Sequence, residues 1–209
     1  MTILAITEHN DLGWIDPVRK AAQGTEITVF PGMELSADSG AGGIHIIAIF
    51  EPNTETIFLD DLITQLGLPR GQRFHSDGSP KLCDRTLSEL VDFITTNGGL
   101  CIAAHVLRDK GILKPESMTG EPRVKAWQNS KLLAAEIPHP RQRLSGFAKQ
   151  VFQNSHTLYK RAHPIAAIYS SPPLWQKPPG ACSSCRSYIW WPPLRLMTSL
   201  TFEIGLNLV

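Results

Sequence analysis

The sequence predicts an α/β protein built on a parallel sheet or barrel, and two observations carry that prediction. Short apolar segments rich in β-branched residues alternate with segments of helical period over residues 1–171. Several of the apolar segments contain almost no polar residue, which is typical of strands covered on both faces by helices. The chain of 209 residues is long enough for one such domain and a tail.

Six strands are expected, and each is a run of mostly aliphatic residues. The second is predicted to end in a turn at Pro31-Gly32, just before Glu34. The six predicted ranges are 2–7, 27–30, 44–50, 100–105, 131–137 and 164–170.

Helices are expected between the strands, and the clearest begins at Thr86. Thr86 and Glu89 have the spacing of a capping box, and Gly98-Gly99 would end the helix. Residues 69–85 are expected to form a polar loop. The other predicted helices cover 17–23, 53–70, a segment ending near 130, and 144–153.

Composition and charge exclude several classes of protein. The net charge of +1 gives no general attraction to nucleic acid or to a membrane surface. No apolar run reaches the roughly 18 residues of a membrane helix. No basic segment precedes the first apolar run, so the start does not resemble a signal peptide. We therefore expect a cytoplasmic protein.

Residues 172–209 differ from the preceding domain and are expected to form an irregular tail. They hold six of the 16 prolines and three of the five tryptophans. Cys182 and Cys185 form an isolated CSSC pair without the two further ligands of a structural zinc site, so we assign neither zinc nor redox chemistry there. Cys83 and Cys101 are expected to be reduced.

Histidines and a glutamate lie beside four of the predicted strands. His9 and His105 follow strands, His45 begins one, and Glu34 comes just after another. Ligands at the carboxyl ends of barrel strands converge on one face, and imidazole with carboxylate suits Zn²⁺, Mn²⁺ or Fe²⁺. The alternative is that these histidines are not metal ligands, because a single histidine at a strand end is more often a hydrogen-bonded residue at the rim of the sheet.

The remaining histidines are not expected in such a site. His75, His139 and His156 fall in polar loop or helix and should be exposed to solvent. His163 precedes a strand, so it would lie at the opposite end of a barrel.

Four segments resemble, in order, the motifs of the PHP (polymerase and histidinol phosphatase) family. They are AITEHN, FPGMELSAD, GGIHIIAIFEP and GGLCIAAHV, and the likeness extends over about residues 1–170. Family members typically show a strand ending in Thr-Asp-His, a Pro-Gly-x-Glu turn, a His-Ile-Leu-Gly strand and a Gly-Gly followed by Ala-His-Pro. The details are most similar to the PHP domain at the front of TrlF-like AAA-type ATPases.

The resemblance implies a distorted (β/α)₇ barrel with two or three divalent metal ions at the strand ends. By motif, the metal ligands would be His9, Glu34, His45 and His105. Glu8 would hold His9 in one tautomer, and Asp11 would support the ligands in the same way. The implied reaction is hydrolysis of a phosphate ester or nucleic-acid end by a metal-activated water, with no side chain as the catalytic group.

Two basic residues just after His105 are plausible phosphate contacts under the same resemblance. These are Arg108 and Lys110. The alternative is that both belong to a solvated loop.

Two family motifs are absent: an early His-x-His and a late Asp-x-His. We therefore expect an incomplete barrel with weak Zn²⁺, Mn²⁺ or Fe²⁺ occupancy and reduced or no activity. Such a chain would come from a gene model that starts late, shifts frame near codon 171 and has lost a downstream ATPase domain.

One alternative is a non-catalytic PHP module that binds phosphate or a partner protein. Another is an unrelated α/β barrel, in which the four candidate ligands would not converge.

Overall fold

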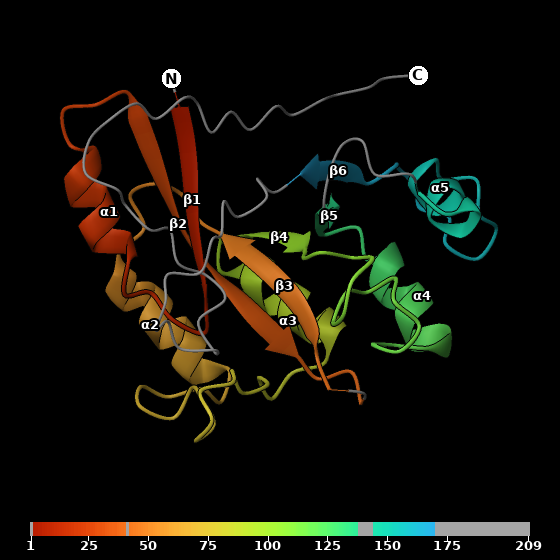
Figure 1. Cartoon of the computed structure of the whole chain (residues 1–209), viewed down its shortest axis with the longest axis horizontal. Helices are drawn as coiled ribbons and strands as arrows, with labels where there is room; N and C mark the ends of the chain where they lie inside the picture. The colour runs from red at the N-terminus through yellow and green to blue at the C-terminus, as the bar shows by residue number, and fades with distance from the viewer. Residues whose placement is uncertain (1, 41, 138–143, 170–209) are drawn as a thin grey trace, which may run out of the picture.

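The computed structural model describes residues 2–40, 42–137 and 144–169, and within them six strands form one sheet in the order of the chain (Figure 1). The strands are β1 (Thr2–His9), β2 (Ile27–Ala37), β3 (Ile44–Ile49), β4 (Leu100–Ala103), β5 (Leu132–Ile137) and β6 (Ala166–Tyr169). The helices are α1 (Ile15–Ala22), α2 (Thr56–Gln65), α3 (Leu87–Thr96), α4 (Gly120–Gln128) and α5 (Gly146–Phe152).

The direction of β3 corrects the prediction of an all-parallel sheet. β1 pairs with β2, β4 with β5 and β5 with β6 in parallel, but β3 is antiparallel to both of its neighbours. The connection from β2 to β3, residues 38–43, is too short for the crossover of a dozen or more residues that parallel strands require. The first residues of β3 therefore lie at the same edge of the sheet as the carboxyl ends of β1, β2 and β4.

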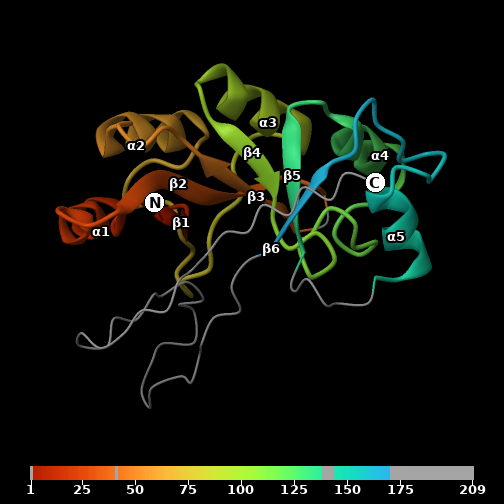
Figure 2. The same ribbon diagram turned by 90° about the horizontal axis from the view of Figure 1, so that it is seen from above.

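The sheet curls into a half-barrel, and α2, α3 and α4 lie along its outer face (Figure 2). Alternation along β2 and β3 sends Met33, Leu35, Ile44 and Ile46 to this face, where each is fully buried. The helices add their own apolar side chains to the same core, among them Leu59, Leu62, Ile63, Leu90, Val91 and Ile94. The opposite face of β2 carries Glu34 and Ser36, so the polar site belongs to the inner face.

Pro31 and Gly32 lie inside β2, so the predicted turn at this position is wrong. Gly32 pairs with Thr7 of β1 and Ile49 of β3, and the Pro31 carbonyl accepts a hydrogen bond from the Phe50 N–H at 2.9 Å. A Cβ atom on Gly32 would lie 2.5 Å from the Ala48 carbonyl oxygen. The close approach of β2 and β3 explains why residue 32 is a glycine. Because β2 continues past it, Glu34 lies within the strand at the site.

The elements form where the sequence predicts them, but β1 and β2 are longer than predicted, and β4 and α2 are shorter. The capping box of α3 is confirmed, with the Thr86 hydroxyl accepting from the Glu89 N–H and the Glu89 carboxylate accepting from the Thr86 N–H. Cys83 and Cys101 are free and buried, and burial raises the pKa of their thiols to about 11 and about 12. No helix in the described part of the chain has the length and apolarity to cross a membrane. The predicted tail at 172–209 lies outside the described residues.

Gly32→Ala should destabilise the fold by about 1–3 kcal/mol, because the added methyl group would overpack against the Ala48 carbonyl. Urea unfolding followed by circular dichroism measures the change. Gly146→Ala is the matched control, because a Cβ there meets nothing within 4 Å and should be neutral or slightly stabilising. Equal unfolding midpoints for the two variants would contradict this account of the strand.

Candidate metal centre

Four strands bring the four predicted ligands together at one edge of the sheet. His9 is the last residue of β1 and lies directly opposite Glu34 of β2. His45 comes to the same edge because β3 runs in reverse, and its partner in the register is Ser36. His105 follows the end of β4. In a strictly parallel sheet, His45 at the start of its strand would have been at the far edge.

One carboxylate oxygen is the centre of the cluster. Glu34 Oε1 lies 2.6 Å from His45 Nδ1, 3.3 Å from His105 Nε2 and 3.5 Å from His9 Nε2. His45 Nδ1 and His105 Nε2 are 3.0 Å apart. The imidazole ring of His45 packs edge-on against the other two, with centroids at 4.7 Å from His9 and 5.0 Å from His105.

These separations fit a divalent metal ion. Bonds of 2.0–2.1 Å in a tetrahedral site place ligand atoms about 3.4 Å apart, and His9, Glu34 and His45 offer ligand atoms that all lie within 4.8 Å of one another. The second nitrogens, His9 Nδ1, His45 Nε2 and His105 Nδ1, are buried without a partner among the described residues. Buried polar atoms are rarely unpaired, and these three nitrogens are not the ones that face Glu34, so the fit to an ion rests on the ligand-atom separations.

Burial and the shared carboxylate set the protonation of the cluster. Burial raises the pKa of Glu34, but hydrogen bonds from His105 and His45 outweigh it and lower that pKa far below its usual range. Burial lowers the pKa values of His9 and His45, which favours their neutral, metal-binding form. Burial would also lower the pKa of His105, but the hydrogen bond and charge of Glu34 raise it.

Glu136 orients His105 and was missed by the sequence analysis. The His105 backbone has a left-handed φ of 29°, and its N–H donates to Glu136 Oε2 at 2.7 Å. The next N–H, that of Val106, donates to the Glu136 carbonyl at 3.0 Å. In the sequence, the feature that could have indicated this role is that Glu136 is the single charged residue in the apolar strand Leu132–Ile137.

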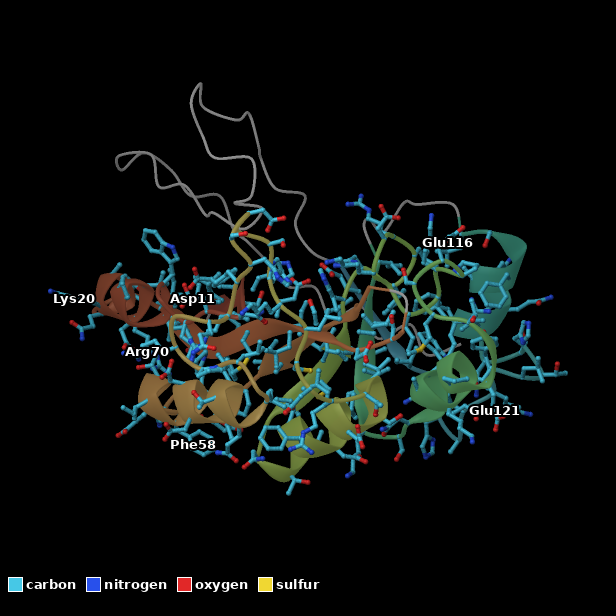
Figure 3. All side chains as sticks on the ribbon, turned by 90° about the horizontal axis from the view of Figure 1, so that it is seen from below. Asp11, Lys20, Phe58, Arg70, Glu116 and Glu121 are labelled. Carbon is cyan, nitrogen blue, oxygen red and sulfur yellow. The ribbon has the colours of Figure 1, made fainter. Side chains whose placement is uncertain are left out.

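Glu8 and Asp11 are not placed as the resemblance implied. Successive residues of a strand face opposite sides, so Glu8 turns away from His9 and accepts instead from the Trp14 N–H at 2.8 Å. Its pKa is raised by burial. Asp11 is exposed on the loop before α1, where it accepts from the Leu12 N–H (Figure 3). Neither contacts the imidazole rings.

Both predicted phosphate contacts have backbone hydrogen bonds to members of the cluster. The Arg108 N–H donates to the His105 carbonyl at 2.8 Å, and the second contact is Lys110. Its carbonyl accepts from the His45 N–H at 3.0 Å, and its positive charge helps to lower the pKa values of His9 and His45. The backbone of Lys110 is also left-handed, with φ of 62°. Arg108 is exposed, and its side chain has no ion pair within the described ranges.

None of the other histidines that the structure describes is a member of the cluster. His75 and His163 are exposed, as predicted. His156 is half-buried against the rings of Phe147 and Tyr159, with centroids at 5.3 Å and 5.1 Å, so its predicted exposure is wrong. His139 lies outside the described residues.

In the metal-free protein, His105 should titrate above His9 and His45, and Glu34→Gln should lower the pKa of His105 by removing the carboxylate beside it. A raised histidine pKa stabilises the fold below its unfolded value of 6.5 and ceases to do so as pH rises through the folded value. NMR titration of the imidazole resonances in EDTA-treated protein measures all three. An unchanged His105 titration in the variant would refute the shared-carboxylate arrangement.

Comparison with known proteins supports the fold alone. No family model matches the chain, and no curated protein does. Among solved structures, a Bifidobacterium adolescentis protein provisionally described as a metal-dependent phosphoesterase is similar with a TM-score of 0.53 and 12% identity, over 80% of this chain and 75% of that one. An amidohydrolase from Chromobacterium violaceum, with bound sulfate and no metal, gives a TM-score of 0.37 and 16% identity, over 70% of this chain and 83% of that one. The half-barrel described above is therefore similar in fold to a protein with that provisional description.

Proposed function

We propose that this chain is a metal-dependent phosphoesterase domain of the PHP type, most similar to those of TrlF-like ATPases. Its six strands would be part of a distorted (β/α)₇ barrel. The observation that supports the proposal is the convergence of three imidazoles, each from a different strand or strand end, on the Glu34 carboxylate of a fourth strand. An unrelated barrel with scattered histidines would not have this geometry.

In this proposal, His9, Glu34, His45 and His105 hold Zn²⁺, Mn²⁺ or Fe²⁺. The bound metal would supply a water activated for attack on phosphorus and would offset negative charge on the phosphoryl oxygens. The low pKa values of Glu34, His9 and His45 keep these side chains in the deprotonated form that ligands need near neutral pH. Glu136 bonds to the backbone N–H of His105 and Glu34 contacts its ring, so the side chain would be oriented before any ion arrives.

The substrate proposed is a phosphate ester or a nucleic-acid end. Lys110 places a positive charge beside the cluster, where it would attract the phosphate group. Arg108 lies on the same segment, and its exposed guanidinium is available for a two-point contact with phosphate oxygens. Both residues follow His105 closely in the chain, so one short segment would supply a ligand and the phosphate contacts.

His45→Ala should weaken binding of Mn²⁺ or Zn²⁺ on the order of 100-fold or more, because it removes the ring in closest contact with Glu34. Isothermal titration calorimetry on EDTA-stripped protein measures the affinity. Hydrolysis of bis(p-nitrophenyl) phosphate, assayed with and without the same metal, measures the activity. His163→Ala, an exposed histidine outside the cluster, is the matched control and should leave both values unchanged.

The outcomes separate the proposal from its rivals. Metal-dependent hydrolysis that His45→Ala abolishes supports a phosphoesterase. Tight metal binding without hydrolysis of any phosphate ester tested would indicate a binding module instead. A wild-type chain that binds no divalent metal would overturn the proposal.

A further inference from the structure

A hairpin lies beside the metal centre within the segment between α2 and α3. The Lys81 N–H donates to the Arg73 carbonyl at 3.0 Å, and the His75 N–H donates to the Ser79 carbonyl at 2.8 Å. Phe74 and Pro80 form the bridge between these two bonds. Figure 1 shows this segment, in yellow, at the end of the sheet to which the β2 arrow points.

The amide of Asn10 is the link between this hairpin and the cluster. Asn10 is completely buried, and its Nδ2 atom donates to the Arg73 carbonyl at 3.1 Å and to the Lys81 carbonyl at 2.9 Å. One side chain thus holds both arms of the hairpin. The Asn10 Oδ1 atom is buried without a partner among the described residues, so the two carbonyls are what fixes this amide.

The backbone of Asn10 is tied to the metal centre at the same time. Asn10 directly follows His9, and its own N–H donates to the carbonyl of Glu34 at 3.0 Å. Its φ of 50° is left-handed, a conformation that asparagine tolerates better than most residues. The side chain therefore turns away from the strand toward the hairpin, while the main chain remains bonded to the residue that centres the cluster.

The rest of the hairpin is anchored to other parts of the fold. The Arg73 guanidinium donates to the Leu68 carbonyl at 3.0 Å and to Asp60 Oδ1 of α2 at 2.6 Å. The Cys83 N–H donates to the Ser36 carbonyl of β2 at 2.8 Å. Because these anchors hold the hairpin in place, the amide of Asn10 ties the end of β1 to a fixed part of the fold. A displacement of the end of β1 would therefore strain its bonds to the hairpin.

We propose that Asn10 is a positioning residue, which couples the 73–81 hairpin to the geometry of His9 and Glu34 and so sets the metal affinity of the cluster. The inference rests on the proposed function. Without the amide, the Lys81 carbonyl loses its donor, the Arg73 carbonyl keeps only the Lys81 N–H, and the end of β1 is no longer held to the hairpin. Mutation of a group bonded directly to a metal ligand typically weakens metal binding about 10–100-fold, and we expect Asn10 at the lower end of that range because its amide bonds only to the hairpin.

The test compares Asn10→Gly with Asn154→Gly. Glycine accepts a left-handed φ, so each variant keeps its backbone and loses only the amide. Asn154 is the matched control: its φ is 56°, and its amide ties the segment after α5 to both the N–H and the carbonyl of Arg161, apart from the cluster. Asn10→Asp is a second variant of nearly equal size, whose carboxylate cannot donate to either carbonyl.

Two measurements on the full chain decide the matter. Calorimetric titration of EDTA-stripped protein with Mn²⁺ should give a Kd at least about 10-fold weaker for Asn10→Gly and an unchanged Kd for Asn154→Gly. Hydrogen exchange of segment 73–81, with and without Mn²⁺, reports the coupling, because a ligand and the element it is linked to affect each other reciprocally. Mn²⁺ should slow this exchange in wild type and Asn154→Gly, and should leave it unslowed in Asn10→Gly and Asn10→Asp.

The failures are distinguishable. If wild type binds Mn²⁺ and both Asn10 variants bind it equally well with the same protection of the hairpin, this inference is wrong and the proposed function stands. If wild type binds neither Mn²⁺ nor Zn²⁺, the proposed function fails and takes the inference with it. An equal loss of affinity in Asn154→Gly would show that general destabilisation, rather than coupling, is responsible.

Discussion

A single buried carboxylate, that of Glu34, organises this end of the sheet. Its side chain is only 12% exposed, so its charge requires compensation from nearby donors. The three histidines supply that compensation, and each arrives from a different strand or strand end. The antiparallel β3, the uninterrupted β2 and the turn after β4 are all needed to bring those rings within reach of one oxygen.

The sequence was sufficient to predict the elements and the four members of the cluster, but not the path of the sheet. Apolar runs predicted six strands, and Thr86 with Glu89 predicted the start of α3. Periodicity carries no information on strand direction, so the reversal of β3 could be found only from the short 38–43 connection. The Pro31-Gly32 pair has the composition of a turn, yet packing against Ala48 explains the glycine equally well.

The supporting residues were harder to predict than the cluster. Glu136 and Asn10 act through a backbone N–H and two backbone carbonyls, which have no sequence signature. Glu8 had the more suggestive position beside His9, but strand alternation turns it to the other face. Residue type and proximity in sequence identify candidates for a metal site, whereas the groups that hold such a site in place depend on the tertiary fold.

The sharing of Glu34 by three imidazoles also makes metal and proton competitors for the same atoms. Below the raised pKa of His105, both nitrogens of that ring are protonated, and the hydrogen bond from Nε2 to Glu34 occupies the nitrogen and the oxygen that an ion would use. Binding of a metal ion in this range would therefore expel a proton into the buffer, and the apparent affinity would fall as the solution is acidified.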